Sequence, residues 1–407
     1  MQPYDVYSIR KQFPIFEQKI NGKPLAYLDS AASAAKPRAV IQAMTSMMER
    51  DYANVHRGLH TLSMRSTDAF EQARRKVADF INAQENEIVF TRNATESINL
   101  VAASFARHNL MEGEAIVITA MEHHANIVPW QILAEQMSLD LKVIPIDQRG
   151  VLDMEAYEAV IKSGNIGLVA VTHVSNVLGS VNPVANIIDA AHAQGVPVLI
   201  DACQSILHMK IDVRALDADF LVFSGHKLYG PTGIGVLYGK AELLEKMPPY
   251  QAGGEMIKEV RFEQTSFAEP PLRFEAGTPA IIEAVGLGAA IDWISDIGLE
   301  RIAAHEAELL EYARLKTREI PEMRILGTAE NKVSVLSFYF DHIHAHDLAT
   351  ILDQEGVAVR AGHHCAQPLL QFFGRAGVAR ASLAAYTTYE EIDQLFAGIK
   401  TAHKLLS

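Results

Sequence analysis

The stretch VPVLIDACQ (residues 196–204) is followed, after a connection of helical length, by DFLVFSGHKLYGPTGIG (residues 219–235). Each stretch starts with a run of apolar residues and then turns polar, which is typical of a buried strand followed by a loop. Similar apolar runs, separated by amphipathic helical segments, occur earlier at residues 87–90, 115–119, 141–146 and 167–174. Continuous apolar strands that alternate with helices predict an α/β fold with a mostly parallel sheet covered by helices on both faces.

The pattern changes after about residue 285, where helical periodicity dominates and two further strand patterns follow at residues 333–340 and 357–362. A last helix is expected from Thr388, whose capping box with Glu391 precedes an apolar stripe starting at Ile392. At 407 residues the chain exceeds the usual size of one core. We therefore expect an N-terminal segment (1–25) that packs with the small domain, a large domain (26–285) and a small C-terminal domain (286–407).

The composition limits the classes of partner. Lys and Arg number 36 against 49 Asp and Glu, so the net charge of −13 argues against binding to a nucleic-acid backbone. No apolar run approaches the roughly 18 residues needed to span a bilayer, and the first residues do not resemble a signal peptide. The two cysteines, Cys203 and Cys365, make no disulfide framework. A globular, cytoplasmic protein without nucleic-acid or membrane partners is expected.

Lys227 and Asp201 are the first candidates for a functional site. Lys227 lies in a glycine-rich loop after an apolar run, and a lysine held there could form a Schiff base. Asp201 ends the preceding apolar run, and a carboxylate at that place suits the ring nitrogen of pyridoxal phosphate. A surface lysine in a turn and an aspartate that caps a helix are the simpler alternatives. Because ligands bind beyond the carboxyl ends of parallel strands, both side chains are expected near one ligand.

Polar residues after the other strands fit the same cofactor. Thr95 opens a helix whose N-terminus could bind a phosphate, to which Ser224 and His226 could also donate. One histidine of the pair in MEHHANIVPW (residues 121–130) could stack on a flat ring, and Asn176 could address its phenolic oxygen. Each residue alone is equally compatible with capping, a turn or a surface role. Their combined order on successive strand ends favours pyridoxal phosphate.

At this point the chain resembles the fold-type I pyridoxal phosphate enzymes, and more narrowly the Suf-type (group II) cysteine desulfurases of the class-V aminotransferase family. The matching motifs extend from about residue 25 to 386 in family order. They are LAYLDSAASA, HRGLHTLS, MEHHANIVPWQ, THVSNVLG, SGHKLYGPTGIG, RFEAGTP and RAGHHCAQPL. SGHKLYGPTG and RAGHHCAQP are the most specific of these.

The resemblance implies a role for each matching residue. Lys227 would bind the cofactor covalently, Asp201 would pair with its ring nitrogen, and His124 would stack on the ring. Arg360 and Arg380, with Asn176, would bind the substrate carboxylate, for which the guanidinium fork is suited. Cys365 would accept sulfur from L-cysteine as a persulfide. The remaining cofactor contacts would come from Thr95, Asn176, Gln204, Ser224, His226 and, from a second subunit, Thr278.

The implied activity is conversion of L-cysteine to L-alanine, in a homodimer that passes sulfur to an acceptor protein of the Suf system for iron–sulfur cluster assembly. A selenocysteine lyase or another class-V aminotransferase is the alternative enzyme, and a metal- or sulfur-binding scaffold that uses its His and Cys loops is the non-enzymatic one. Consecutive ligands such as His363, His364 and Cys365 rarely converge on a metal, so no metal is expected. Cys203 is interpreted as a buried small hydrophobe. Where the family commonly has GTTE, this chain has NATE (residues 93–96), whose asparagine tolerates a left-handed backbone.

Overall fold

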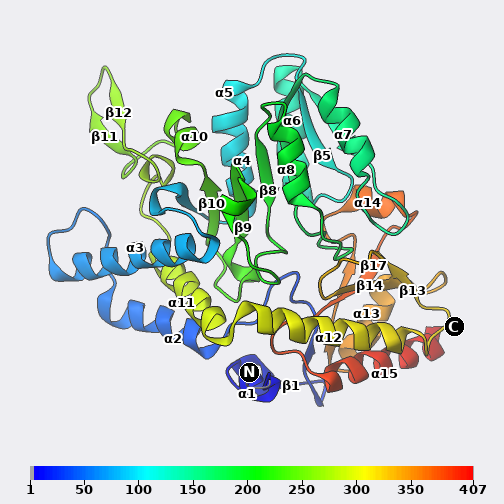
Figure 1. Cartoon of the computed structure of the whole chain (residues 1–407). Coiled ribbons are helices and arrows are strands. Elements are labelled where there is room, and N and C mark those ends of the chain that lie inside the picture. Colours follow the sequence, from blue (N-terminus) through cyan, green and yellow to red (C-terminus); the bar gives the residue numbers. More distant parts are fainter. Residues whose placement is uncertain (1–3, 407) are drawn as a thin grey trace.

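The computed structural model describes residues 4–406, and its centre is a seven-stranded sheet of order β4-β10-β9-β8-β7-β5-β6 (Figure 1). Strand β10 pairs antiparallel with both of its neighbours, and all other neighbouring pairs are parallel. The expected mostly parallel α/β sheet is therefore confirmed. Sequence reasoning missed β10, a five-residue run bounded by glycines. The strands are β4 (Ile88–Thr91), β5 (Ala115–Thr119), β6 (Asp140–Ile144), β7 (Ile166–Thr172), β8 (Val198–Asp201), β9 (Phe220–Ser224) and β10 (Gly235–Gly239).

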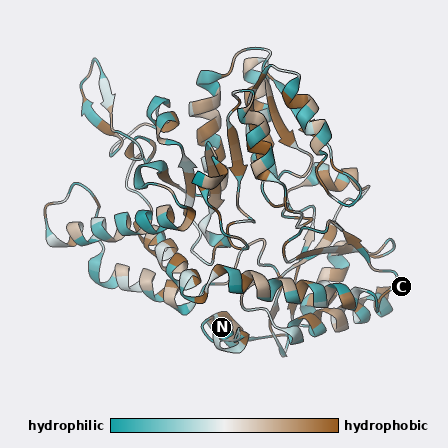
Figure 2. Ribbon diagram, in the orientation of Figure 1, coloured by the Kyte–Doolittle hydropathy of each residue, from teal (hydrophilic) through white to brown (hydrophobic). Residues whose placement is uncertain are grey.

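Both faces of this sheet are buried. The two faces pack against two different clusters of buried apolar side chains. In β8, Leu199 belongs to one cluster and Val198 and Ile200 belong to the other, because successive side chains of a strand point to opposite faces. Figure 2 shows apolar strands enclosed by helices that carry their hydrophilic residues outward. The α-helices between residues 38 and 297 are α2 (Arg38–Ser46), α3 (Thr61–Ile81), α4 (Ala94–Leu100), α5 (Arg107–Asn109), α6 (Val128–Met137), α7 (Met154–Lys162), α8 (Val184–His192), α9 (Val213–Leu216), α10 (Ala241–Lys246) and α11 (Ile281–Ile297).

A second sheet of order β13-β14-β17-β16 forms the centre of the C-terminal part and is antiparallel throughout. The capping box before α15 is present: Thr388 N–H donates to Glu391 Oε2 (2.9 Å), and Glu391 N–H donates to Thr388 Oγ1 (3.3 Å). The predicted apolar stripe of α15 is buried. The elements are α12 (Leu299–Thr317), β13 (Arg324–Leu326), β14 (Val335–Tyr339), α13 (Ala345–Gln354), β15 (Val357–Ala358), β16 (Arg360–Gly362), α14 (Gln367–Phe372), β17 (Val378–Ser382) and α15 (Tyr389–Leu406).

Two predicted elements are divided in the structure. The helical stretch after residue 280 breaks between α11 and α12 at Gly298, whose φ of 94° lies outside the helical range. The strand expected at residues 357–362 becomes β15 and β16, because the chain changes partner between them. Strand β15 pairs with β3 (Ala26–Tyr27), whereas β16 pairs with β17. The local sequence pattern of a strand does not reveal which other strand it pairs with, so this division could not be predicted.

The N-terminal segment contacts the C-terminal elements. Arg10, the last residue of α1 (Val6–Arg10), makes an ion pair with Glu391 (2.9 Å), and Tyr4 Oη donates to the Ala385 carbonyl (2.7 Å). Phe13 packs edge-on against Trp293 of α11. Two-stranded ribbons complete the fold: β1 (Lys19–Ile20) with β2 (Lys23–Pro24), and β11 (Ile257–Val260) with β12 (Thr265–Phe267). Within residues 4–406, no helix has the length and apolar character that crossing a bilayer requires.

Candidate active site

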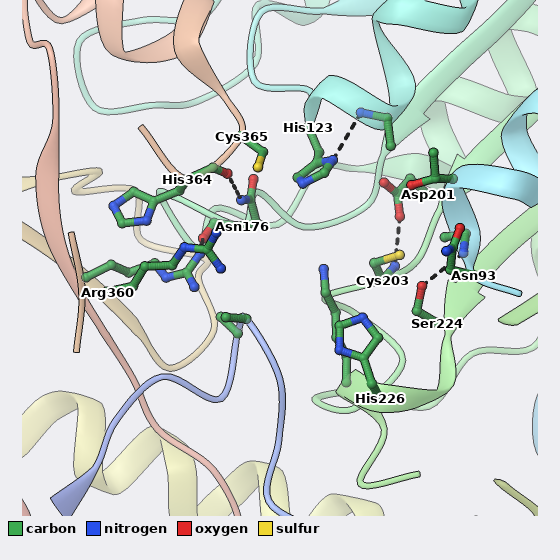
Figure 3. A pocket seen from close by; sticks show the side chains of 17 residues that line it. Asn93, His123, Asn176, Asp201, Cys203, Ser224, His226, Arg360, His364 and Cys365 are labelled. Atoms are coloured by element: carbon green, nitrogen blue, oxygen red, sulfur yellow. Dashed lines mark hydrogen bonds between the residues drawn. The ribbon is translucent and has the colours of Figure 1, made fainter. Parts of the chain in front are cut away.

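A cavity of about 250 Å³ lies beyond the carboxyl ends of β8 and β9 (Figure 3). The C-terminal part of the chain contributes to its wall through β16, β17 and the loop that follows β16. The cavity brings together most of the residues singled out in the sequence, from segments up to 285 positions apart (Thr95 to Arg380). Those residues are Thr95, Asn176, Asp201, Ser224, His226, Lys227, Arg360, Cys365 and Arg380.

Lys227 and Asp201 reach the cavity from adjacent strand ends. Asp201 is the last residue of β8 and is buried, and its Oδ1 accepts from the Cys203 N–H (2.9 Å). Lys227 ends the short turn η6 (Gly225–Lys227), which follows β9 directly. Tight packing also explains the glycine at residue 235, where the loop after Lys227 enters β10. A Cβ on Gly235 would lie 2.4 Å from the Asn93 Cα. Any side chain at residue 235 would push β10 away from the start of α4.

Hydroxyl groups gather at another wall of the cavity, around the start of α4. The Ala94 N–H donates to Ser224 Oγ (2.9 Å), so this bond does not use the Ser224 hydroxyl proton, which can be donated to a ligand. Asn93 caps the helix through its side chain, which accepts from the Glu96 N–H (2.9 Å). Its φ of −175° is extended, so Asn93 does not use the left-handed conformation that asparagine tolerates. Thr95 lies in the first turn and is exposed to the cavity.

The histidine pair requires a correction. His123 lines the cavity, whereas His124 does not (Figure 3). Burial and the neighbouring Lys227 charge lower the pKa of His123 to about 4, so its ring is neutral near pH 7. His124, which was expected to stack on the cofactor, instead contacts the loop that carries Cys365. The short 3₁₀ turn η5 (His124–Asn126) rotates consecutive side chains apart, and the sequence alone does not say which one faces inward.

Gln204 and Thr278 also lie outside the residues that line this cavity. Gln204 Nε2 donates to the Ala31 carbonyl (2.8 Å), so its side chain holds a backbone segment that lines the cavity. Thr278 lines a separate pocket with Glu275 and Arg92. That position accords with its expected role toward a second subunit, which stays a prediction.

Two arginines from strands β16 and β17 supply positive charge at the cavity. Arg380 is almost fully buried, and its guanidinium donates to the Asn176 carbonyl (2.9 Å) and to Asp29 Oδ1 (3.2 Å). Its Nε has no hydrogen-bond partner among the described residues. Since a buried N–H is normally paired, a bound anion would satisfy it. Arg360 begins β16 and is exposed to the cavity.

The loop after β16 carries Cys365 with an unusual backbone. His364 (φ 53°) and Cys365 (φ 55°) both adopt the left-handed conformation, which is uncommon for residues other than glycine. His364 is buried and shares a hydrogen bond with the Val378 carbonyl, and burial lowers its pKa to about 3. His363 instead is exposed. The side chains of His363 and His364 therefore lie in different surroundings and do not form a metal cage with Cys365.

Cys203 forms part of the cavity wall but differs from Cys365. It is buried, and burial together with the nearby Asp201 charge raises the pKa of its thiol far above the ordinary value. A thiol that stays protonated is a poor nucleophile. Cys365 is partly exposed.

The cavity residues fit pyridoxal phosphate. An amine, a carboxylate, a neutral imidazole and hydroxyl donors line one space, with two guanidinium groups beside it. These groups match the cofactor's aldehyde, ring nitrogen, aromatic face and phosphate, and leave cations for the carboxylate of an amino acid.

Comparisons with known proteins agree with this fit. A family model described as class-V aminotransferase matches residues 26–395. A cysteine desulfurase of Dickeya dadantii (strain 3937) is 52% identical over 408 residues, which cover 100% of this chain and 98% of that protein. The crystal structure of a cysteine desulfurase from Escherichia coli has a TM-score of 0.92 at 39% identity and covers 100% of both chains. The apo structure of a cysteine desulfurase from Thermococcus onnurineus NA1 has a TM-score of 0.93 at 40% identity and covers 100% of this chain and 98% of that one.

The chain therefore belongs to the class-V aminotransferase family of pyridoxal-phosphate-dependent enzymes, and its sheet is that of fold type I. Within this family it belongs with the cysteine desulfurases, as do its full-length relatives and both solved structures. The family, the fold class and the cofactor expected from the sequence are confirmed.

Proposed function

We propose that the chain is a cysteine desulfurase that converts L-cysteine to L-alanine and leaves the sulfur on Cys365 as a persulfide. The observation that supports this most directly is the composition of one cavity. It combines Lys227 and Asp201 with two arginines and an accessible thiol. A transaminase would also need the lysine, the aspartate and the two arginines, but its reaction does not require a cysteine on a loop at the cavity wall.

The cofactor, when bound, supplies an electron sink that makes the bonds at the substrate's α and β carbons labile. Lys227 would hold it covalently, and Asp201 would keep its ring nitrogen protonated. The neutral ring of His123 takes the stacking position in this proposal. Thr95, Ser224 and His226 would bind the phosphate, with Ser224 donating the hydroxyl proton that its bond to the Ala94 N–H leaves free.

Arg360 and Arg380 would orient the substrate through its carboxylate. The unpartnered Nε of Arg380 gives this group a donor in place before the substrate arrives. Lys227 Nζ, once released from the cofactor, is the base in the cavity that can move the Cα proton. Cys365 Sγ, as the thiolate, then attacks the substrate sulfur. An S–S bond forms, the Cβ–S bond breaks, its electron pair stays on carbon, and protonation of that carbon completes alanine.

The partial exposure of Cys365 suits the next step, in which the persulfide sulfur passes to an acceptor. We propose a protein acceptor of the Suf type and a role in iron–sulfur cluster assembly, as the resemblance implies. The enzyme is proposed to act as a homodimer, in which Thr278 of one subunit completes the phosphate site of the other.

The test is turnover of L-cysteine by the purified holoenzyme, with alanine and Cys365 persulfide measured by mass spectrometry. The wild type should form both, and borohydride reduction should fix the cofactor to Lys227. Lys227→Ala should lose the visible absorbance of the cofactor together with alanine formation. A Lys227→Ala variant that keeps its absorbance and activity would sink the assignment. L-Selenocysteine as a parallel substrate separates a desulfurase from a selenocysteine lyase.

A further inference from the structure

His124 makes two hydrogen bonds to the loop that carries Cys365, although the two lie 241 positions apart in the chain (365 − 124). Its backbone N–H donates to the Cys365 carbonyl (2.7 Å). Its Nε2 accepts from the N–H of Gln367, the first residue of α14 (3.0 Å). These bonds hold the loop on both sides of Ala366. The residue that precedes His124 in the chain is His123, which lines the cavity.

The bond from Gln367 specifies the protonation state of His124. A backbone N–H can only donate, so Nε2 must carry a lone pair, and the ring must be neutral with its proton on Nδ1. Partial burial and the adjacent His363, whose ring centroid lies 5.5 Å away, both lower the pKa of His124. The surroundings thus favour the form of the ring that can accept this bond.

The Cys365 loop needs contacts from outside, because its own backbone is strained. Two successive residues, His364 and Cys365, adopt left-handed dihedrals that non-glycine residues hold only when their surroundings impose them. Besides the two bonds from His124, one further hydrogen bond reaches this turn from the residues that the structure describes before residue 286. Asn176 Nδ2 donates to the His364 carbonyl (2.8 Å). Asn176 also lines the cavity.

We propose that His124 is a positioning residue that holds the Cys365 loop against the end of β5, so that the thiol stays beside the cavity. The proposal rests on Cys365 being the sulfur acceptor. Because residues 123 and 124 are adjacent, one end of β5 serves both partners of the sulfur transfer. His123 faces the cavity, and His124 holds the nucleophile's loop.

Two matched variants test this. His124→Leu removes the acceptor, whereas His124→Gln offers Oε1 at a reach similar to that of Nε2. The first measurement is alkylation of Cys365 by iodoacetamide in the resting holoenzyme, located by peptide mass spectrometry, which needs no turnover. His124→Leu should be alkylated about twofold to tenfold faster, the range expected for the loss of one hydrogen bond. His124→Gln should react at nearly the wild-type rate.

The second measurement is turnover together with the cofactor's visible spectrum. His124→Leu should lower kcat for alanine formation by a similar factor, with KM for L-cysteine and the spectrum little changed, and His124→Gln should restore kcat. A changed spectrum or loss of cofactor in His124→Leu would overturn the proposal in favour of a ring-stacking role for His124. Unchanged alkylation in His124→Leu, or equal damage in both variants, would also overturn it. Should the wild type fail to release alanine, the proposed function fails while the alkylation result still reports on the loop.

Discussion

The two cysteines show how much a residue's surroundings decide its chemistry. Both thiols line the same cavity, yet Cys203 is buried beside the Asp201 carboxylate and Cys365 is partly exposed on a loop. The raised pKa of Cys203 keeps its thiol protonated near pH 7. Sequence reasoning interpreted Cys203 as a buried small hydrophobe and placed Cys365 on a loop after a glycine, and the structure agrees with both.

Removing each thiol in turn should therefore give opposite results. Cys365→Ala is expected to retain the cofactor spectrum while alanine formation falls almost to zero, because the attacking sulfur is gone. Cys203→Ala should retain nearly full turnover. Alanine release from L-cysteine is the measurement for both. A large loss of turnover in Cys203→Ala would mean that the roles of the two thiols were wrongly divided.

At the scale of elements, buried acidic groups tie the strand ends to their neighbours. Glu122 follows β5 and is fully buried, and its carboxylate accepts from Thr119 Oγ1 (2.6 Å), Asn126 Nδ2 (2.7 Å) and the Thr172 N–H (2.9 Å). The last bond links the end of β5 to the end of β7. Burial raises the pKa of Glu122 to about 7 despite these donors.

The raised pKa of Glu122 predicts a pH-dependent stability. The folded state holds the Glu122 proton more tightly than the unfolded chain, so the free energy of unfolding should fall as the pH rises from about 4.5 to about 7. The contribution of this one group is on the order of 3 kcal/mol. Urea unfolding of the wild type and Glu122→Gln at pH 5 and pH 8 measures it. The wild type should lose stability relative to the variant at the higher pH, and a difference that is independent of pH would contradict the prediction.

A second buried acid, Glu275, connects α3 with the segment that leads to Thr278. Both of its oxygens accept from the Arg74 guanidinium (2.7 and 2.9 Å), and Oε1 also accepts from the Phe90 N–H of β4 (2.7 Å). Arg74 is almost fully buried, so the loss of this partner leaves a charge with only Glu71 to balance it. Buried pairs of this kind are costly to break from one side.

Glu275→Leu should accordingly lower the free energy of unfolding by roughly 3 kcal/mol. Urea titration followed by far-ultraviolet circular dichroism measures the change. Glu259→Leu is the matched control, because the Glu259–Arg261 pair is exposed on both sides and should contribute little. Equal effects of the two substitutions would show that burial does not strengthen the Arg74–Glu275 pair.

At the scale of the whole molecule, the surface suggests a partner subunit. Large apolar side chains are exposed along one stretch of chain, which runs from α2 through η2 (Met47–Asp51) and the following loop into α3. Leu59, in that loop, is 98% exposed in the single chain. Apolar side chains gathered in this way are typical of an interface. These residues are Ile41, Met48, Tyr52, Leu59, Leu62 and Met64. Thr278 lies outside the cavity of its own subunit, as a residue that serves a neighbour would.

Mixing an inactive variant with one of weakened cofactor binding tests both the proposed homodimer and the position of Thr278. Lys227→Ala lacks the cofactor lysine, and Thr278→Ala should weaken phosphate binding in the opposite subunit. A mixed dimer contains one site with an intact Lys227 and an intact Thr278 from its partner. We expect subunit exchange to restore alanine formation toward about a quarter of the wild-type rate per total subunit, the statistical limit for random pairing. Thr278→Ala with wild-type cofactor retention, or no recovery on mixing, would contradict the arrangement.

The sequence by itself determined six of the seven strands of the large sheet, its mostly parallel order and the residue types that gather at its ligand-binding edge. Apolar periodicity reflects burial, and polar residues that follow buried runs must lie at the ligand-binding edge of such a sheet. It also placed the capping box of α15, because the capping residues and their partners are close in the chain.

Only the tertiary structure decided which of two adjacent histidines faces the cavity. It also decided that the chain changes its partner strand between β15 and β16, and that β10 enters the sheet antiparallel. These outcomes depend on contacts between distant segments, such as His124 with Gln367 or β15 with β3. Neighbouring residues have nearly the same local pattern, so their orientation is decided by the segment that packs against them.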